Sequence, residues 1–251
     1  MKNTYDVIVI GAGAAGLMCS IEAGKRGKSV CLVDHSSKIA EKIRISGGGR
    51  CNFTNLYSNP SNFISNNKHF CKSAFAKYTQ NDFIDLIKKH NIDFYEKKLG
   101  QLFCITSAKE IIDMLIAECM AQNVEINKET KISSLTKNQN TYSIKTNKGV
   151  YSCSSLVIAT GGLSIPKIGA TDFGYRIAKQ FNLKVTNLLP ALVPLTFEEK
   201  ELEFCKSLAG VSLNASVKFN KTVFNEGLIF THRGISGPSI LQISSYWEIK
   251  Q

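Results

Sequence analysis

One stretch near the start of this 251-residue chain reads Tyr5-Asp6-Val7-Ile8-Val9-Ile10-Gly11-Ala12-Gly13-Ala14-Ala15-Gly16. Its β-branched run at residues 7–10 is typical of a strand buried on both faces of a parallel sheet. Three glycines with GxGxxG spacing follow directly, then an apolar-periodic helix pattern to Gly27 and a second strand that ends at Asp34. Together these features predict the strand–turn–helix–strand unit that binds a dinucleotide.

The glycines of this turn have separate physical roles. Gly11 permits the tight turn, Gly13 lets the backbone approach a pyrophosphate, and Gly16 lets the helix pack close to the strand. The N–H groups and the dipole at the start of the helix favour the phosphate charge. Asp34 can accept hydrogen bonds from a ribose diol.

The composition is ordinary for a folded globular protein, with 43% hydrophobic and 20% charged residues. The length allows one large domain or two smaller ones. No apolar run approaches the ~20 residues of a membrane-spanning helix, and the start of the chain lacks the apolar core of a signal peptide. We therefore expect a cytoplasmic protein with no membrane partner.

The eight cysteines are scattered, without a CxxC pair. This usage fits reduced thiols that pack as small hydrophobes. No Cys/His group has the spacing of zinc ligands, so no metal is expected. The CxxxxC redox pair of most pyridine-nucleotide disulfide reductases is also missing from the sequence.

The formal net charge is +11, from 31 basic and 20 acidic side chains. Charge alone is compatible with nucleic-acid binding. The lysines are spread along the chain, however, and form no evident basic stripe with interleaved aromatic residues, which favours a lysine-covered surface. We therefore expect a small-molecule substrate and no nucleic-acid partner, and no oligomeric state is predicted.

A second glycine-rich stretch reads Ser46-Gly47-Gly48-Gly49-Arg50-Cys51-Asn52-Phe53-Thr54-Asn55. Successive glycines permit positive φ values and a close approach of the backbone to a ligand. With its polar neighbours, such a loop can form an anion-binding nest. The alternative interpretation is a flexible surface turn.

This loop, placed after a GAGAAG turn, resembles the HI0933-like family of FAD-dependent oxidoreductases, which includes aminoacetone oxidase-type flavoenzymes and bile-acid-type enone reductases. Two later stretches resemble the same family: residues 156–162, which read LVIATGG, and residues 230–241, which read FTHRGISGPSIL. The resemblance thus covers almost the whole chain.

The resemblance implies an extended FAD, with its pyrophosphate at the first glycine turn and its flavin near the second glycine-rich loop. Asp34 stands where such flavoproteins usually have Glu, so we expect its ribose contact to pass through water. Ile132 is implied near the adenine. The full set of implied cofactor-binding residues is Gly11, Gly13, Ala14, Ala15, Gly16, Asp34, His35, Lys42, Ser46, Gly47, Gly48, Gly49, Arg50, Cys51, Asn52, Thr54, Asn55, Ile132, Thr160, Gly161 and Gly162.

The remaining pattern predicts further elements of the first domain. A short helix capped by Ser36 or Ser37 is expected before the second glycine-rich loop. Alternating strands are expected before a return to the parallel sheet at residues 156–159. His69 and His90 are interpreted as surface or helix-end residues, because neither has a visible partner. The other expected elements are helices at 60–66, 69–78, 81–90 and 107–122, a hairpin of 93–96 with 101–105, and antiparallel strands at 130–135, 142–146 and 150–153.

A proline-punctuated connector at residues 188–195 indicates a change of domain. We expect an FAD-binding domain at residues 1–187 and an incomplete inserted β-rich domain at residues 188–251. Because family members continue further, the chain is expected to be an N-terminal fragment or a prematurely terminated product, without the C-terminal return segment of the FAD domain. His232 and Arg233 either bind substrate or form a turn of the β-rich domain.

The expected fold class is α/β, with a Rossmann-like FAD-binding domain on a parallel sheet and the start of a β-rich insert. The expected function is FAD-dependent hydride transfer through flavin N5, with NAD(P)H as a candidate donor. Two alternatives stay open: a catalytically incompetent FAD-binding fragment, and an NAD-dependent dehydrogenase, which leaves the SGGGRCN loop unexplained. No catalytic residue is assigned. Cys51 could approach the flavin, but a packing thiol is the preferred interpretation.

Overall fold

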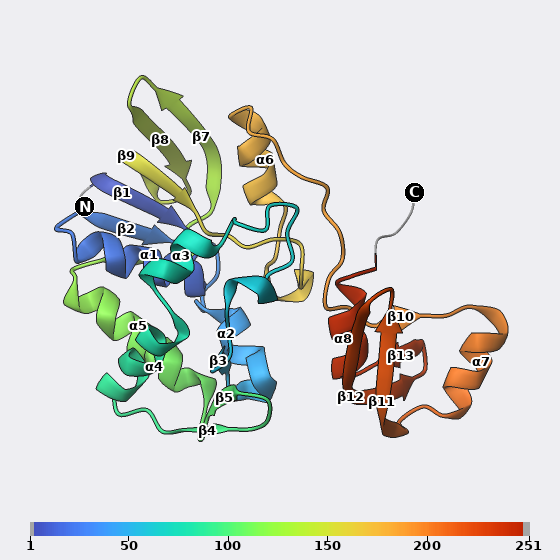
Figure 1. Cartoon of the computed structure of the whole chain (residues 1–251). Helices are drawn as coiled ribbons and strands as arrows, with labels where there is room; N and C mark the ends of the chain where they lie inside the picture. The colour runs from blue at the N-terminus through green and yellow to red at the C-terminus, as the bar shows by residue number, and fades with distance from the viewer. Residues whose placement is uncertain (1–2, 248–251) are drawn as a thin grey trace. The chain divides into compact units, whose positions relative to one another are not determined.

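The computed structural model describes residues 3–247 and divides the chain into two compact units, Met1–Val185 and Thr186–Gln251. Figure 1 shows both, and each is described by itself below.

The first unit is built on a six-stranded sheet with the order β6-β2-β1-β9-β8-β7. The neighbours β6, β2, β1 and β9 pair in parallel, and β9-β8-β7 continue as an antiparallel meander (Figure 1). The six strands are β1 (Thr4–Ile10), β2 (Val30–Val33), β6 (Glu125–Asn127), β7 (Ile132–Asn138), β8 (Thr141–Thr146) and β9 (Gly149–Ile158).

Strand β1 is buried on both faces, as its sequence predicts. Val9 packs in one apolar cluster with Leu17 of helix α1 (Ala14–Gly24) and Leu115 of helix α5 (Ala108–Ala121). Ile8 and Ile10 pack in a second cluster, against which Phe173 and Ile177 of helix α6 (Phe173–Gln180) lie. Because neighbouring strand residues point to opposite faces, only an unbroken apolar run can fill both clusters.

The return to the parallel sheet differs from the sequence-based expectation in one respect. The segments expected at 150–153 and 156–159 are a single strand, β9, which pairs with both β8 and β1. The intervening Ser154 does not interrupt it, since the Ser154 hydroxyl donates to the carbonyl of Asp6 at 2.9 Å. One strand thus connects the antiparallel and parallel halves.

A smaller sheet, β3-β5-β4, and short helices complete this unit. The helix expected at 60–66 is only the 3₁₀ turn η2 (Pro60–Asn62), and the helix expected at 69–78 shortens to α3 (Lys72–Lys77). All residues from 61 to 70 are exposed, so a helix there would have no apolar face to bury. The remaining elements are α2 (Glu41–Ile45), η1 (Ser46–Gly49), β3 (Asn52–Asn55), α4 (Gln80–Lys89), β4 (Phe94–Glu96), β5 (Gln101–Cys104) and η3 (Pro166–Ile168).

Helix α2 does not begin at the expected serine caps. Its N-cap is Ala40, in the left-handed region at φ 60°, and no side chain caps it. Ser36 instead donates its backbone N–H to the carboxylate of Asp34 at 2.8 Å. Local hydrogen bonding to Asp34 therefore replaces the predicted cap.

The second unit is a four-stranded antiparallel sheet in the order β10-β13-β12-β11. The long β11–β12 hairpin turns at Asn220, which has a φ of 53°. Ser239 of α8 donates its hydroxyl to the carbonyl of Gly227 in β12 at 3.0 Å, which fixes that helix on the sheet. The elements are β10 (Leu195–Thr196), α7 (Glu199–Ser207), β11 (Ser212–Phe219), β12 (Thr222–Thr231), β13 (Gly234–Ser236) and α8 (Pro238–Ser244).

Between residues 3 and 247, no helix combines the length and the apolar character that crossing a membrane requires. Within the same range, no group of three or more His, Cys, Asp or Glu side chains is placed to hold a metal ion.

Candidate dinucleotide site

A cavity of about 910 Å³ lies within the first unit, where three parallel strands end. Its wall includes Ile10, Val33 and Ile158, the last residues of β1, β2 and β9. In open parallel sheets, ligands bind outside the carboxyl ends of the strands. The cavity therefore occupies the position at which a Rossmann-like sheet presents its ligand site.

The first glycine turn forms one wall of this cavity. Gly11 has a φ of +105°, and a Cβ there would lie 2.6 Å from the carbonyl oxygen of Ala159. A Cβ on Gly16 would collide with the carbonyl of Gly11. Gly13 also lines the cavity, but it differs from both because nothing lies within 4 Å of a Cβ built on it. Two glycines therefore allow close packing, and the third leaves space on the cavity side.

Helix α1 begins at this turn without a side-chain cap. Its N-cap is Gly13, no side chain accepts a bond from its first N–H groups, and its first turn holds no acidic residue. An uncapped helix N-terminus of this kind suits an anion, because N–H groups and the dipole both favour negative charge. Ala14 and Ala15, the first residues of the helix, also line the cavity.

Asp34 connects the end of β2 to the glycine turn. One carboxylate oxygen accepts the N–H of Ala12 at 2.7 Å, and the other accepts the N–H of Ser36 at 2.8 Å. The carboxylate lines the cavity, and each of its oxygens has a further lone pair for a ribose hydroxyl. The sequence predicts the ribose role but does not reveal the backbone contacts.

The opposite wall comes from the segment after β9. Thr160, Gly161 and Gly162 line the cavity, and Thr160 Oγ1 is buried without a hydrogen-bond partner among the described residues. Buried polar atoms usually have partners, so this hydroxyl suits a polar ligand. Lys42 Nζ donates to Ser164 Oγ at 2.5 Å, which links α2 to the same segment. The residues present thus fit a dinucleotide cofactor.

The second glycine-rich loop is only partly in the wall. Ser46, Cys51 and Asn52 line the cavity, whereas residues 47–49 and Arg50 do not. Arg50 is exposed, and Asn55 forms a turn in which its side chain donates to the carbonyl of Leu99 and accepts from the N–H of Tyr57. Burial raises the pKa of the Cys51 thiol, so this group is neutral at pH 7.

The structure brings most of the implied residues to one cavity. Those in the wall are Gly11, Gly13, Ala14, Ala15, Asp34, His35, Lys42, Ser46, Cys51, Asn52, Ile132, Thr160, Gly161 and Gly162. Those outside it are Gly16, Gly47, Gly48, Gly49, Arg50, Thr54 and Asn55.

Several wall residues were not predicted. Phe53, Phe83, Ile111 and Leu115 give the cavity an apolar side, and Phe173 and Arg176 of α6 close another part of the wall. In the sequence, Phe83, Ile111, Leu115 and Phe173 are indistinguishable from ordinary core positions of amphipathic helices, so no sequence signal marked them. Their position depends on how α4, α5 and α6 pack.

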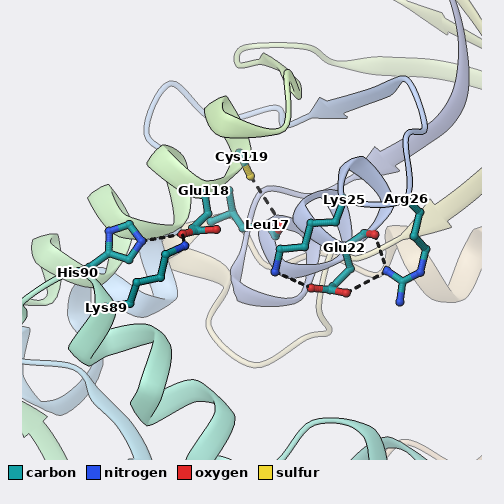
Figure 2. Close-up of polar contacts among 8 residues, drawn as sticks. All are labelled: Leu17, Glu22, Lys25, Arg26, Lys89, His90, Glu118 and Cys119. Carbon is teal, nitrogen blue, oxygen red and sulfur yellow. Dashed lines mark hydrogen bonds and ion pairs between the residues drawn. The ribbon is translucent and has the colours of Figure 1, made fainter.

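His90 has a partner that the sequence did not reveal. Figure 2 shows His90 and Lys89, at the end of α4, converging on Glu118 of α5. His90 Nε2 and Lys89 Nζ each lie 2.7 Å from Glu118 Oε1, and the carboxylate is only 7% exposed. The hydrogen bond from Lys89, with that from His90, lowers the pKa of Glu118. Neither His90 nor His69 lines the cavity, so this cluster joins two helices rather than forming an acid–base site.

His232 and Arg233 lie in the second unit, in the tight turn between β12 and β13. The N–H of Arg233 donates to Thr231 Oγ1 at 3.2 Å, and its carbonyl accepts the N–H of Phe197. Both side chains are exposed. Of the two interpretations left open by the sequence, the turn is the one that these contacts describe.

The fold and the cavity together define a Rossmann-type nucleotide-binding protein. The chain belongs to the HI0933-like family, because residues 5–240 match the family model described as the HI0933-like protein Rossmann domain. The resemblance seen in the sequence is thereby confirmed.

Two curated relatives share close to half of their aligned residues with this chain. A ribosomal RNA dihydrouridine synthase of Escherichia coli K12 is 51% identical over 97% of this chain and 61% of the relative. Its counterpart of the same name in Haemophilus influenzae is 46% identical over 99% of this chain and 63% of the relative. The chain thus spans less than two thirds of the length of these relatives. Among solved structures, a flavocytochrome c3 fumarate reductase has a TM-score of 0.52 and 20% sequence identity to this chain. The match covers 84% of this chain and 47% of the reductase chain, and it supports the fold alone.

Proposed function

We propose that this chain binds FAD, and that the whole protein is a flavin-dependent reductase that converts uridine in ribosomal RNA to dihydrouridine. The observation that carries the FAD assignment is the space at Gly13, where an uncapped helix N-terminus faces a cavity of about 910 Å³. The RNA assignment is supported by the activity after which the two bacterial relatives are named, ribosomal RNA dihydrouridine synthase. It replaces our expectation that nucleic acid is not a partner.

Bound FAD would supply a hydride which, with a proton, reduces the C5=C6 bond of uracil, and a reduced pyridine nucleotide is the proposed source of the electrons. The residues of this chain bind and orient the cofactor. The N-terminus of α1 stabilises the pyrophosphate, and Asp34 accepts a ribose hydroxyl directly or through water. Thr160 donates its unpartnered hydroxyl to the cofactor. Phe53 and Phe83 exclude water from their side of the cavity.

Cofactor identity tests the first part of the proposal. The chain is incubated separately with FAD, FMN and NAD⁺, freed of unbound ligand and extracted with acid, and the extract is separated by chromatography. We expect FAD to be retained at one per chain and the other two to be lost. Retention of NAD⁺ in place of FAD would support the dehydrogenase alternative and contradict the proposal.

Nucleoside analysis tests the second part. The protein, FAD and a reduced pyridine nucleotide are incubated with ribosomal RNA, which is then digested to nucleosides. We expect a nucleoside two hydrogens heavier than uridine to accumulate with the parent chain but not with Gly13→Val. A related bile-acid enzyme gives the alternative outcome: a 3-dehydro-bile acid delta(4,6)-reductase of Clostridium scindens is 24% identical over 95% of this chain. Reduction of a small enone with no change in RNA would favour that substrate class.

A further inference from the structure

The net positive charge of the chain lies in the first unit. Residues 1–185 hold 25 basic and 14 acidic side chains, whereas residues 186–251 hold six of each. The excess is sharpest at residues 42–81, a stretch of 40 residues with no Asp or Glu and with six Lys or Arg. A local excess of this kind attracts polyanions.

Within this stretch, residues 56–79 present aromatic rings to solvent. The exposed fractions are 68% for Tyr57, 52% for Phe63, 77% for Phe70 and 39% for Tyr78. Lys68, Lys72 and Lys77 lie between these rings in the sequence, and none forms an ion pair with another residue of the described range. The sequence showed no evident basic stripe with interleaved aromatic residues, because its lysines are spread along the chain. The structure shows that residues 56–79 combine exposed rings with unpaired lysines.

The 56–79 segment is held in place by its own contacts. Asn59 caps η2 in a reciprocal arrangement with Asn62, and the Asn59 side chain accepts the N–H of Ser61 at 3.0 Å. Phe63 and Phe75 meet edge to face, with 5.2 Å between ring centroids. These contacts hold the backbone while leaving Tyr57 and Phe70 exposed.

Both ends of this segment adjoin the wall of the cavity. Asn52 and Phe53 of β3 precede the segment and Phe83 of α4 follows it, and all three line the cavity. Gln80 Nε2 donates to the carbonyl of Leu56 at 3.0 Å, which joins the two ends. A nucleic-acid strand bound along residues 56–79 would therefore enter the cavity on the side of Phe53 and Phe83.

We propose that residues 56–79 form a docking surface for single-stranded RNA, on which bases stack against Tyr57 and Phe70 while Lys68 and Lys72 contact phosphates. This inference rests on the proposed RNA substrate and identifies the surface that holds it. Base stacking on aromatic rings is tolerant of sequence, and basic side chains follow the backbone, so the two together bind unpaired strands. A duplex keeps its bases stacked internally and cannot use the rings.

Fluorescence anisotropy tests the surface with the parent chain, FAD and a labelled single-stranded oligouridylate of about 12 nucleotides, within the site sizes of such surfaces. Phe70→Ala should weaken RNA binding by about tenfold, because one stacking contact is lost, and should leave the salt dependence unchanged. Lys68→Gln with Lys72→Gln should reduce the slope of log K against log salt by about 1.4, because two phosphate contacts on a single strand are lost. A duplex of equal length should compete poorly.

Matched controls lie outside the segment. Met120→Ala removes a side chain that is 68% exposed on α5, and Lys145→Gln with Lys179→Gln removes two exposed charges from β8 and α6. The controls should bind RNA like the parent, and every variant should retain FAD, because none of the changed residues lines the cavity.

The outcomes separate this inference from the proposed function. If the parent binds RNA and the segment variants bind equally well, the docking surface is wrong and the RNA substrate stands. If the parent retains FAD but binds no RNA, the docking surface and the RNA substrate are both wrong, and the FAD assignment stands. If Phe70→Ala changes self-association in sedimentation but not RNA binding, the rings form a contact between copies of the chain, and the RNA surface is overturned.

Discussion

Residues 11–16 and residues 46–50 are both rich in glycine, yet their surroundings differ. In the first stretch, Cβ atoms on Gly11 or Gly16 would run into backbone atoms of the same unit. In the second, Gly48 and Gly49 have positive φ values of 68° and 86° but nothing within 4 Å of a Cβ. Packing thus requires glycine at positions 11 and 16, whereas at positions 48 and 49 only the backbone conformation favours it. Gly11, Gly13, Ala14 and Ala15 of the first stretch line the cavity, whereas only Ser46 of the second does.

The largest expected effect comes from one methyl group at the most crowded glycine. Gly16→Ala should destabilise the unit by more than about 4 kcal/mol, because the new Cβ meets the carbonyl of Gly11 and α1 must move away from β1. Urea unfolding followed by circular dichroism measures the loss. Gly13→Ala is the matched control, since its Cβ enters open space, and we expect it to cost less than about 1 kcal/mol. If Gly16→Ala and Gly13→Ala were equally stable, the inference that packing requires glycine at position 16 but not at position 13 would be wrong.

Next in size is the effect of a larger side chain at Gly13. Gly13→Val should leave the fold intact but weaken FAD binding by more than about 3 kcal/mol, because charge-assisted bonds to the pyrophosphate are lost. Flavin fluorescence titration gives the affinity, and the melting curve reports the fold. Unchanged FAD affinity in a folded variant would show that the pyrophosphate lies elsewhere.

A change outside both stretches tests what supports the first turn. Helix α1 packs on α5, where Cys119 Sγ donates to the carbonyl of Leu17, and Glu118 links α5 to the end of α4 (Figure 2). Glu118→Gln should cost about 1–3 kcal/mol at pH 7, because hydrogen bonds to a buried charge are weakened. Since the pKa of Glu118 is lowered on folding, this stabilisation is complete above the ordinary value of 4.5 and is lost as the pH falls through the lowered pKa.

The control for this change is Glu22→Gln. Glu22 contacts Lys25 and Arg26 on the surface of α1, as Figure 2 shows, and its side chain is 39% exposed. Exposed ion pairs contribute about 0–1 kcal/mol, so the control should lose little stability at pH 7. Urea midpoints at neutral and acid pH for both variants test the prediction, and a pH-independent loss in Glu118→Gln would contradict it.

The smallest expected effect is at the second glycine-rich loop. Arg50 is exposed and outside the cavity wall, so Arg50→Ala should change FAD affinity by less than about 1 kcal/mol, within the range of surface substitutions. A direct charge-assisted bond, as the family resemblance implies, would instead cost about 1.5–3 kcal/mol. A loss of that larger size in titration would show that the loop closes over the flavin when it binds.

Sequence patterns predicted the parts of the fold that local chemistry determines. The β1–α1–β2 unit and the hairpin of β4 and β5 follow from periodicity and turn residues. The helix expected at 60–66 failed because its apolar residues, Phe63 and Ile64, remain exposed, and propensity alone does not sustain a short helix. The continuity of β9 through Ser154 depended on a hydrogen bond to Asp6, a residue 148 positions earlier, which no local pattern contains.

Contacts between residues far apart in the chain also limited the prediction of the site. Glycine spacing located Gly13, and the resemblance located residues 160–162, because both depend on short segments. The apolar wall at Phe53, Phe83 and Leu115 depends on the packing of three elements far apart in the chain, so these residues were missed. Arg50 shows the converse, since its motif suggests a ligand contact although the residue lies outside the cavity wall.

The pairing of β1 with β9 also sets an order of events during synthesis. Thr4 of β1 and Ser152 of β9 are partners separated by 148 positions, and the N–H of Ala159 bonds to the carbonyl of Ile10 only when this pairing is made. At ribosomal rates of about 5–20 residues per second, β1 is made roughly 7–30 s before its neighbour. Throughout that interval the apolar edge of β1 has no partner on the β9 side, and the wall at Thr160 does not exist. A nascent chain therefore cannot complete its cofactor site until β9 and the segment after it have been made.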